Sequence, residues 1–309
     1  MAKLPWTEQS KPKEYRGHKS KVHSVSWSCD GKKLASGSTD STARVWHVEK
    51  QHHGRDFVEL RGHTQAVEQV AFHPSDADLL ATTSSDKTVR IWDTKSLKCL
   101  REVSTLGENI NLCWHPNGQM IAVGNKDDIV VFIDAESMEI IKSMQFSFEV
   151  NEVTWNSKGD KFFITTGLGT VQILSYPELN VVYTINAHTS NCYCLKFDPK
   201  HRYLAVGSAD ALASLWELDT LTCLKTFTEM EWPIRCLSFS HDGEFLAMAS
   251  EDSHILICNT ETGKQVFKVP SNSATNSIAW HPNKYQLAYA CDDNDRSRSD
   301  YGIYVFGQL

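Results

Sequence analysis

Two stretches of the chain combine histidine, a hydroxyl residue and aspartate in an order that would suit hydrolytic chemistry, and a third has the histidine and the aspartate. In such a set the aspartate orients the histidine, and the histidine takes a proton from the serine or threonine nucleophile. The sets are His18, Ser36 and Asp40; His63, Thr82 and Asp86; and His188 and Asp210, with Val206 at the hydroxyl position. A single active site would not recur in this way, and no G-x-S-x-G nucleophile motif accompanies the sets. We therefore expect a structural role and no catalysis.

A tryptophan follows each set and indicates what the set does. Trp46, Trp92 and Trp216 each lie six residues after the aspartate. In the expected arrangement the histidine donates to the aspartate and contacts the hydroxyl, and the hydroxyl accepts a hydrogen bond from the indole N–H. Loss of one member would leave the others unpaired, at a cost of about 1–3 kcal/mol each. These residues resemble the structural tetrad of WD-repeat proteins.

Other residue types that bind ligands lack the necessary companions. Cys192 and Cys194 lie near His188, but no second ligand pair follows at zinc-site spacing, and the tetrad already uses the histidine. The run Gly167-Leu168-Gly169 has no remainder of a phosphate-binding loop. We expect no metal, cofactor or small-molecule substrate.

The tetrads belong to a repeat that runs through the whole chain. Each unit contains an apolar strand ending in an aromatic residue, a polar turn, a second apolar strand, a turn that often contains aspartate, and a third strand. The closing aromatics recur at intervals of 41 to 45 residues, at Trp27, Phe72, Trp114, Trp155, Phe197, Phe239 and Trp280. Seven units of this length predict an all-β fold, a seven-bladed WD40 propeller with four-stranded blades.

The two ends of the chain predict how the ring closes. The last repeat provides strands near 275–280, 286–291 and 302–306, and lacks a fourth. Residues 13–16 precede the first tetrad histidine, in the position of a fourth strand that has no blade before it. We expect this N-terminal strand to complete the last blade. The domain assignment is therefore an N-terminal segment, residues 1–16, followed by a single propeller domain, residues 17–309.

Composition limits the compartment and the partners. The net charge is −7, from 38 acidic and 31 basic residues, which argues against a protein that coats nucleic acid over its whole surface. The sequence has no apolar signal-peptide core and no membrane-spanning run. We therefore expect the nine cysteines to be reduced, buried thiols of a cytosolic or nuclear protein. The best basic cluster is N-terminal, and we expect its contact with RNA to be indirect or weak; it comprises Lys11, Lys13, Arg16, Lys19 and Lys21.

A ring of polar residues is the best candidate for a binding surface. The position two residues before each closing aromatic is apolar in every repeat, whereas the position four before it is polar or amphipathic in six of seven. This contrast predicts that the second set faces a central opening, either as a partner-binding ring or as a hydrated funnel. Its polar members are His23, Glu68, Asn151, Tyr193, Arg235 and Asn276. Trp232, beside a proline, is either an exposed anchor for a partner or a packed residue.

Several stretches carry a resemblance more specific than the fold. GENINLCWHPNGQMIAVGNKDDIVVFIDA, FEVNEVTWN, LSYPELN and WPIRCLSFSHDGEFLAMASED resemble the THO complex subunit 3 family, and the likeness extends from residue 17 to about residue 293. The likeness includes repeats three, four and six, which lack a complete tetrad. The resemblance implies a nuclear subunit of the THO part of the TREX complex, which couples transcription to messenger-RNA packaging and export. It also implies partners: the large THO scaffold subunit, the other THO subunits and, indirectly, a DEAD-box helicase and an export adaptor.

Two alternatives remain open at this point. Trp92-Asp93-Thr94-Lys95 resembles the WD-x-R/K box of substrate receptors of cullin-type ubiquitin ligases, although the box overlaps an ordinary WD repeat. Ser297 and Ser299 lie between arginines, where they are either phosphorylation sites or part of a solvated loop.

Overall fold

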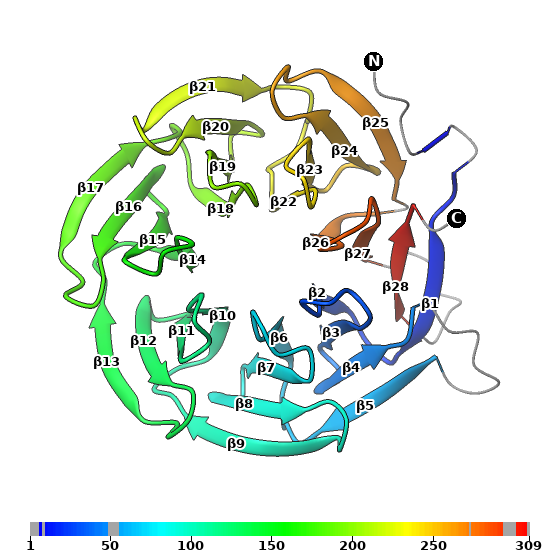
Figure 1. Cartoon of the computed structure of the whole chain (residues 1–309), viewed down its shortest axis with the longest axis vertical. Coiled ribbons are helices and arrows are strands. Elements are labelled where there is room, and N and C mark those ends of the chain that lie inside the picture. Colours follow the sequence, from blue (N-terminus) through cyan, green and yellow to red (C-terminus); the bar gives the residue numbers. More distant parts are fainter. Residues whose placement is uncertain (1–5, 8–9, 49–55, 272, 293–300, 308–309) are drawn as a thin grey trace.

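The short apolar runs near the axis form strands that are buried between neighbouring sheets, whereas the outermost strand of most blades is largely exposed. The computed structural model describes residues 6–7, 10–48, 56–271, 273–292 and 301–307. Within these residues the strands form seven antiparallel four-stranded sheets, arranged as blades around a central axis (Figure 1). The seven-bladed propeller predicted from the repeat is confirmed. No described segment is a helix able to cross a membrane.

In each blade the strands follow one another from the centre of the ring outwards. Blade 1 contains β2 (Val22–Trp27), β3 (Leu34–Ser38), β4 (Thr42–Trp46) and β5 (Phe57–Arg61). Blade 2 contains β6 (Val67–Phe72), β7 (Leu79–Ser84), β8 (Thr88–Asp93) and β9 (Lys98–Ser104). Blade 3 contains β10 (Asn109–Trp114), β11 (Met120–Asn125), β12 (Ile129–Asp134) and β13 (Ile140–Gln145). Blade 4 contains β14 (Val150–Trp155), β15 (Lys161–Thr166), β16 (Thr170–Ser175) and β17 (Val181–Asn186).

The remaining blades repeat this order, with one exception in the last. Blade 5 contains β18 (Cys192–Phe197), β19 (Tyr203–Ser208), β20 (Ala213–Glu217) and β21 (Thr222–Phe227). Blade 6 contains β22 (Cys236–Phe239), β23 (Phe245–Ala249), β24 (His254–Asn259) and β25 (Gln265–Pro270). Blade 7 contains β26 (Thr275–Trp280), β27 (Leu287–Cys291) and β28 (Tyr301–Phe306), and its outer strand is β1 (Lys13–His18).

A hydrogen bond from one repeat position links adjacent blades near the axis. The residue three before the closing aromatic accepts from a backbone N–H of the next blade at four interfaces. Ser24 Oγ accepts from Val70 (3.0 Å), Gln69 Oε1 from Leu112 (2.7 Å), Glu152 Oε2 from Leu195 (2.8 Å) and Ser277 Oγ from Val25 (3.1 Å). At the other three interfaces Asn111, Cys194 and Cys236 donate to backbone carbonyls instead. The inner strands therefore form a ring that is linked at every interface.

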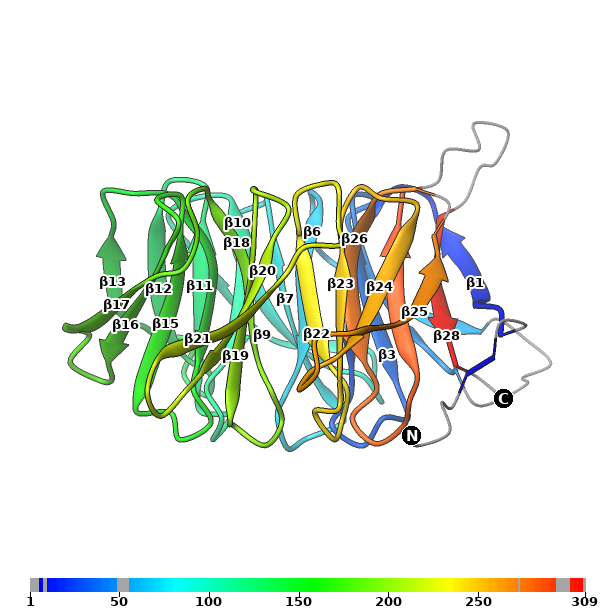
Figure 2. The same ribbon diagram turned by 90° about the horizontal axis from the view of Figure 1, so that it is seen from above.

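The N-terminal strand closes this ring, as the sequence predicts. β1 pairs with β28 in antiparallel register, with Lys13 opposite Val305 and Tyr15 opposite Ile303 (Figures 1 and 2). β1 extends to His18, so the histidine of the first tetrad lies on the strand that completes the last blade. One strand thus contributes to the structure of two blades.

Trp6 forms a second closure that the sequence analysis did not single out. Its ring is only 4% exposed and lies between blades 6 and 7, against Phe245 and Phe267 on one side and Trp280 and Phe306 on the other. Its indole N–H donates to the Tyr285 carbonyl (3.2 Å). Aromatic burial of this extent is a large stabilising contribution.

We expect the N-terminal segment to be essential for stability. Trp6→Ala should lower the free energy of unfolding by about 3–5 kcal/mol, because it empties an aromatic pocket. Deletion of residues 1–16 should cost more, since it also removes most of β1. Denaturant unfolding of the variants checks this, with the exposed Thr7→Ala as the control. A truncated protein that melts within about 1 °C of the full chain would show that the ring closes without this segment.

Candidate functional site

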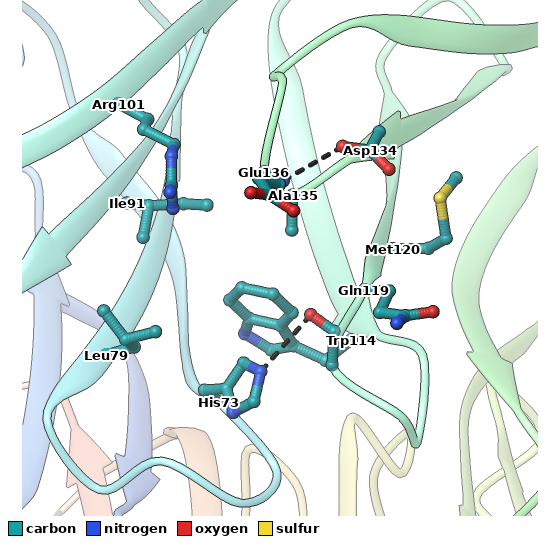
Figure 3. Close-up of a pocket in the computed structure, with 11 residues that line it drawn as sticks. His73, Leu79, Ile91, Arg101, Trp114, Gln119, Met120, Asp134, Ala135 and Glu136 are labelled. Carbon is teal, nitrogen blue, oxygen red and sulfur yellow. Dashed lines mark hydrogen bonds between the residues drawn. The ribbon is translucent and has the colours of Figure 1, made fainter.

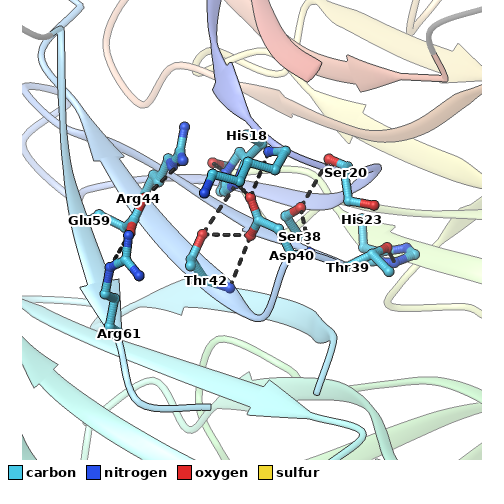
Figure 4. A network of polar contacts seen from close by, with 12 residues as sticks. His18, Ser20, His23, Ser38, Thr39, Asp40, Thr42, Arg44, Glu59 and Arg61 are labelled. Carbon is cyan, nitrogen blue, oxygen red and sulfur yellow. Dashed lines mark hydrogen bonds and ion pairs between the residues drawn. The ribbon is translucent and has the colours of Figure 1, made fainter. Parts of the chain in front are cut away.

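The first tetrad is a buried hydrogen-bond chain between β1, β3 and β4, and Figure 4 shows the part of it around His18, Asp40 and Thr42. His18 Nδ1 lies 2.9 Å from Asp40 Oδ2, and His18 Nε2 lies 2.7 Å from Ser36 Oγ. The Trp46 indole donates to the same hydroxyl (2.8 Å). Asp40 also accepts from the Lys19 backbone and from Thr42. The aspartate therefore orders the turn before β4 as well as the histidine.

The second tetrad repeats this geometry in blade 2. His63 lies 2.9 Å from Asp86 and 2.7 Å from Thr82 Oγ1, and the Trp92 indole donates to that hydroxyl (2.9 Å). Burial lowers the pKa of His63, and the Asp86 carboxylate opposes this shift only in part. Burial alone would raise the pKa of Asp86, but hydrogen bonds from Thr88 and the Thr64 N–H outweigh it and lower the pKa to about 2.

The third set keeps its chemistry but takes its hydroxyl from another strand. His188 Nδ1 lies 3.1 Å from Asp210, as in the other blades. Ser214 Oγ, on β20, lies 2.9 Å from His188 Nε2 and accepts from the Trp216 indole (2.7 Å). Ser214 is the cross-strand partner of Val206, the residue that stands at the usual hydroxyl position. A serine two residues before the tryptophan was the available sequence signal, and the sequence analysis missed it.

The tetrad hydroxyls lie inside the fold and are used in internal hydrogen bonds. Ser36 and Thr82 are fully buried, and each hydroxyl is engaged by both the histidine and the tryptophan. Burial lowers the pKa of His18, and the hydrogen bond to Asp40 opposes this shift only in part. In this arrangement the sets hold strands and turns together.

The structure brings the predicted polar ring together at the centre of the propeller. All six of its members line one cavity of about 610 Å³ on the axis, together with Ile110 of blade 3. His23, Tyr193, Arg235 and Asn276, with Lys21, also line a space of about 400 Å³. Trp232 lies outside both cavities, in the loop between β21 and β22, and is 51% exposed.

Most of the ring's polar groups already have partners. His23 Nε2 lies 2.7 Å from Thr39 Oγ1, and Glu68 accepts from Ser85 (2.7 Å). Arg235 pairs with Glu251. Asn151 differs, because its Nδ2 is buried without a hydrogen-bond partner among the described residues. An unpaired buried donor is costly, so Asn151 differs in this respect from the other ring residues.

An ion pair within the channel was not anticipated. Glu152, three before its aromatic, pairs with Lys196, one before the aromatic of the next blade. Burial alone would lower the pKa of Lys196, but the carboxylate outweighs it and raises the pKa. The opposite charges at these positions of neighbouring repeats were a sequence signal for the ion pair. A comparison of one repeat position at a time does not detect it, because the two residues occupy different positions.

Other predicted residues are placed less favourably for function. In the basic cluster, Arg16 pairs with Glu14 and Lys21 with Asp292. The expectation that the cysteines are buried is wrong for Cys99 and Cys223, which lie exposed on the outer strands β9 and β21. Ser297 and Ser299 lie outside the described residues.

The fold and the tetrads define the chain as a WD-repeat β-propeller. A family model, the THOC3 beta-propeller domain, matches residues 18–290. The chain is 50% identical over 298 residues to THO complex subunit 3 of Arabidopsis thaliana, covering 96% of this chain and 95% of the relative. It therefore belongs to the THO complex subunit 3 family, which confirms the resemblance found in the sequence.

More distant similarities agree with this placement. WD repeat-containing protein AAC3 of Dictyostelium discoideum is 34% identical, over 96% of this chain and 66% of the relative. The Poly(A)+ RNA export protein of Schizosaccharomyces pombe is 27% identical, over 79% of this chain and 72% of the relative. The Cps50 (Swd1) propeller of Myceliophteria thermophila superposes with a TM-score of 0.82 at 18% identity, over 97% of this chain and all of that one, and shows the fold alone.

The hydroxyl of Ser214 should be as important as those of the two regular tetrads. Ser214→Ala leaves the Trp216 indole and His188 without their partner, and should cost about 1–3 kcal/mol in the free energy of unfolding. Its neighbour Thr226 is exposed, so Thr226→Ala is the matched control. Equal stability of the two variants in urea unfolding would refute the assignment.

Proposed function

We propose that the chain is a non-catalytic scaffold subunit of the THO part of the TREX complex. In that role it supports the coupling of transcription to messenger-RNA packaging and nuclear export. The observation that carries the proposal is the 50% identity to THO complex subunit 3 along almost the full length of both chains. The similarity to a Poly(A)+ RNA export protein points in the same direction.

The proposed work of the subunit is to bind other proteins in the nucleus. The partners are other THO subunits, chiefly the large scaffold subunit, and a DEAD-box helicase and an export adaptor through them. RNA contact is indirect or weak in this proposal, because acidic side chains already pair with Arg16 and Lys21 of the basic cluster and the net charge is −7.

We further propose the axial ring as a partner-binding surface. Its members converge on one cavity, and Asn151 offers an unpaired donor there. Tyr193 adds an aromatic side chain for which no internal hydrogen bond is seen in the described part of the chain. Aromatic residues in a recess with a few polar groups are typical of binding hot spots. The exposed Trp232 lies in the loop that joins blades 5 and 6 and would extend this surface.

The ubiquitin-ligase alternative is less well supported by the geometry of its box. Asp93 accepts hydrogen bonds from Ser96 and from the Lys95 backbone, and Lys95 Nζ lies 2.5 Å from Asp78. Asp93 is thus used within the turn after β8, and Lys95 pairs with a residue of the loop between β6 and β7. The box has the interactions of an ordinary blade turn.

A tagged pull-down from nuclease-treated nuclear extract, read by mass spectrometry, tests the proposal. We expect stoichiometric recovery of the large THO subunit, because protein surfaces and not RNA would hold it. The double variant Asn151→Ala/Tyr193→Ala should recover at least fivefold less, while Lys200→Ala, an exposed change outside the ring, should recover as much as the wild type. Recovery of a cullin adaptor without THO subunits would contradict the proposal and favour the ligase alternative.

A further inference from the structure

A cavity of about 470 Å³ opens between blades 2 and 3, away from the axis (Figure 3). Its apolar lining includes Leu79 and Ile91 of blade 2 and Trp114 of blade 3, and Arg101 lies at its edge. Ala135, the first residue after β12, also faces it. We call this cavity the 2/3 groove. The equivalent grooves between other blades contain an aromatic side chain that the 2/3 groove lacks.

The next groove, between blades 3 and 4, is filled by a tyrosine. Tyr176, the first residue after β16, is the repeat counterpart of Ala135. Its ring centroid lies 5.5 Å from that of His115, 6.0 Å from Phe132 and 5.6 Å from Trp155. These three residues are the repeat counterparts of His73, Ile91 and Trp114, which line the 2/3 groove. A tyrosine in blade 4 therefore occupies the space that Ala135 leaves open.

The groove between blades 6 and 7 is filled by a side chain from another segment. Trp6 packs there on Phe245, Phe267 and Trp280. The repeat counterparts of these residues are Leu79, Arg101 and Trp114, again the lining of the 2/3 groove. The molecule thus provides an example of a groove of this kind receiving a tryptophan from a chain segment that is not part of either blade.

Exposure of the closing tryptophans marks the 2/3 groove as unfilled. Trp155 and Trp280, whose grooves contain Tyr176 and Trp6, are 4% and 6% exposed, whereas Trp114 is only half-buried. Arg101 has no ion pair among the described residues, and it is the repeat counterpart of Phe267, which packs against Trp6 in a tilted arrangement. Its guanidinium is placed to stack on an aromatic ring that enters the groove.

We infer that the 2/3 groove binds an aromatic side chain, tryptophan in preference, from an extended segment of a partner THO subunit. A recess of this size, with apolar walls from Leu79, Ile91 and Trp114 and polar groups that include Arg101 and Glu136, fits a single aromatic anchor. Aromatic residues of this kind dominate interface energetics. This inference rests on the proposed function for the identity of the partner. The chemistry of the occupant rests on Trp6 and Tyr176 alone.

The groove can be tested without any partner. The probe is N-acetyl-tryptophanamide, titrated into the full chain labelled with ¹³C at the methionine methyls, since Met120 lines the groove. We expect a saturable shift of the Met120 signal, absent with N-acetyl-alaninamide. Ala135→Tyr, which copies blade 4, should weaken binding at least tenfold, and Arg101→Gln should weaken it severalfold. Glu178→Ala, an exposed change on blade 4, should bind as the wild type does.

Stability separates a filled groove from a damaged fold. Ala135→Tyr should melt at or above the wild-type temperature; if it does not fold, Ala135→Leu replaces it, because blade 5 has Leu218 at this position. No shift at Met120 with the probe, or an equal shift in a folded, filled variant, would overturn the inference.

The pull-down then decides the partner. We expect the folded Ala135→Tyr variant to recover a THO subunit at least fivefold less well than the wild type and Glu178→Ala. If wild type and variant recover THO subunits equally, the docking inference fails and the proposed function stands. If the wild type recovers none, the proposed function and the partner fail together, and the probe titration alone decides whether the groove takes an aromatic ring.

Discussion

The pairing of β1 with β28 is the interaction on which the rest of the structure depends. Each blade buries its faces only against its neighbours, so the stack is stable only when its two ends meet. β1 supplies the outer strand of blade 7 and, through His18, the first tetrad of blade 1. Trp6 packs on the other face of blade 7, against blade 6. Closure of the ring therefore determines the positions of the axial ring residues and of the grooves between blades.

The blades use different interactions for the same purpose. Blades 1, 2 and 5 have polar tetrads, whereas Phe132 packs on Phe162 between blades 3 and 4, where no tetrad exists. Between blades, serine, glutamine and glutamate accept hydrogen bonds at some interfaces, and asparagine and cysteine donate at others. This variety leaves the architecture regular but the surfaces different. The open 2/3 groove follows from one such difference, the small side chain of Ala135.

The sequence predicted most of the fold, because a closed propeller shows its repeat in the spacing of single aromatics. The sequence predicted β1 as the closing strand, because the last repeat has only three strands of its own. It did not predict Trp6, because no periodicity marks a side chain that fills a groove from outside the repeat. Ser214 was missed for a related reason: the hydroxyl moved across the strand pair from Val206, and only the register reveals that the two are neighbours. The placement of the polar ring followed from alternation, but Glu152–Lys196 and the 2/3 groove depend on contacts between blades.

Hydrogen exchange of the inner-strand amides tests the central claim that closure makes the seven blades one cooperative unit. The amides of Val25, Val70, Leu112 and Leu195 each donate across a different interface, and Val25 donates across the junction of blades 7 and 1. The account predicts that all four exchange with the same free energy, equal to that of global unfolding. Exchange at Val25 that is faster by more than about tenfold, a difference of about 1.4 kcal/mol, would contradict it and show that the ring opens at the junction on its own.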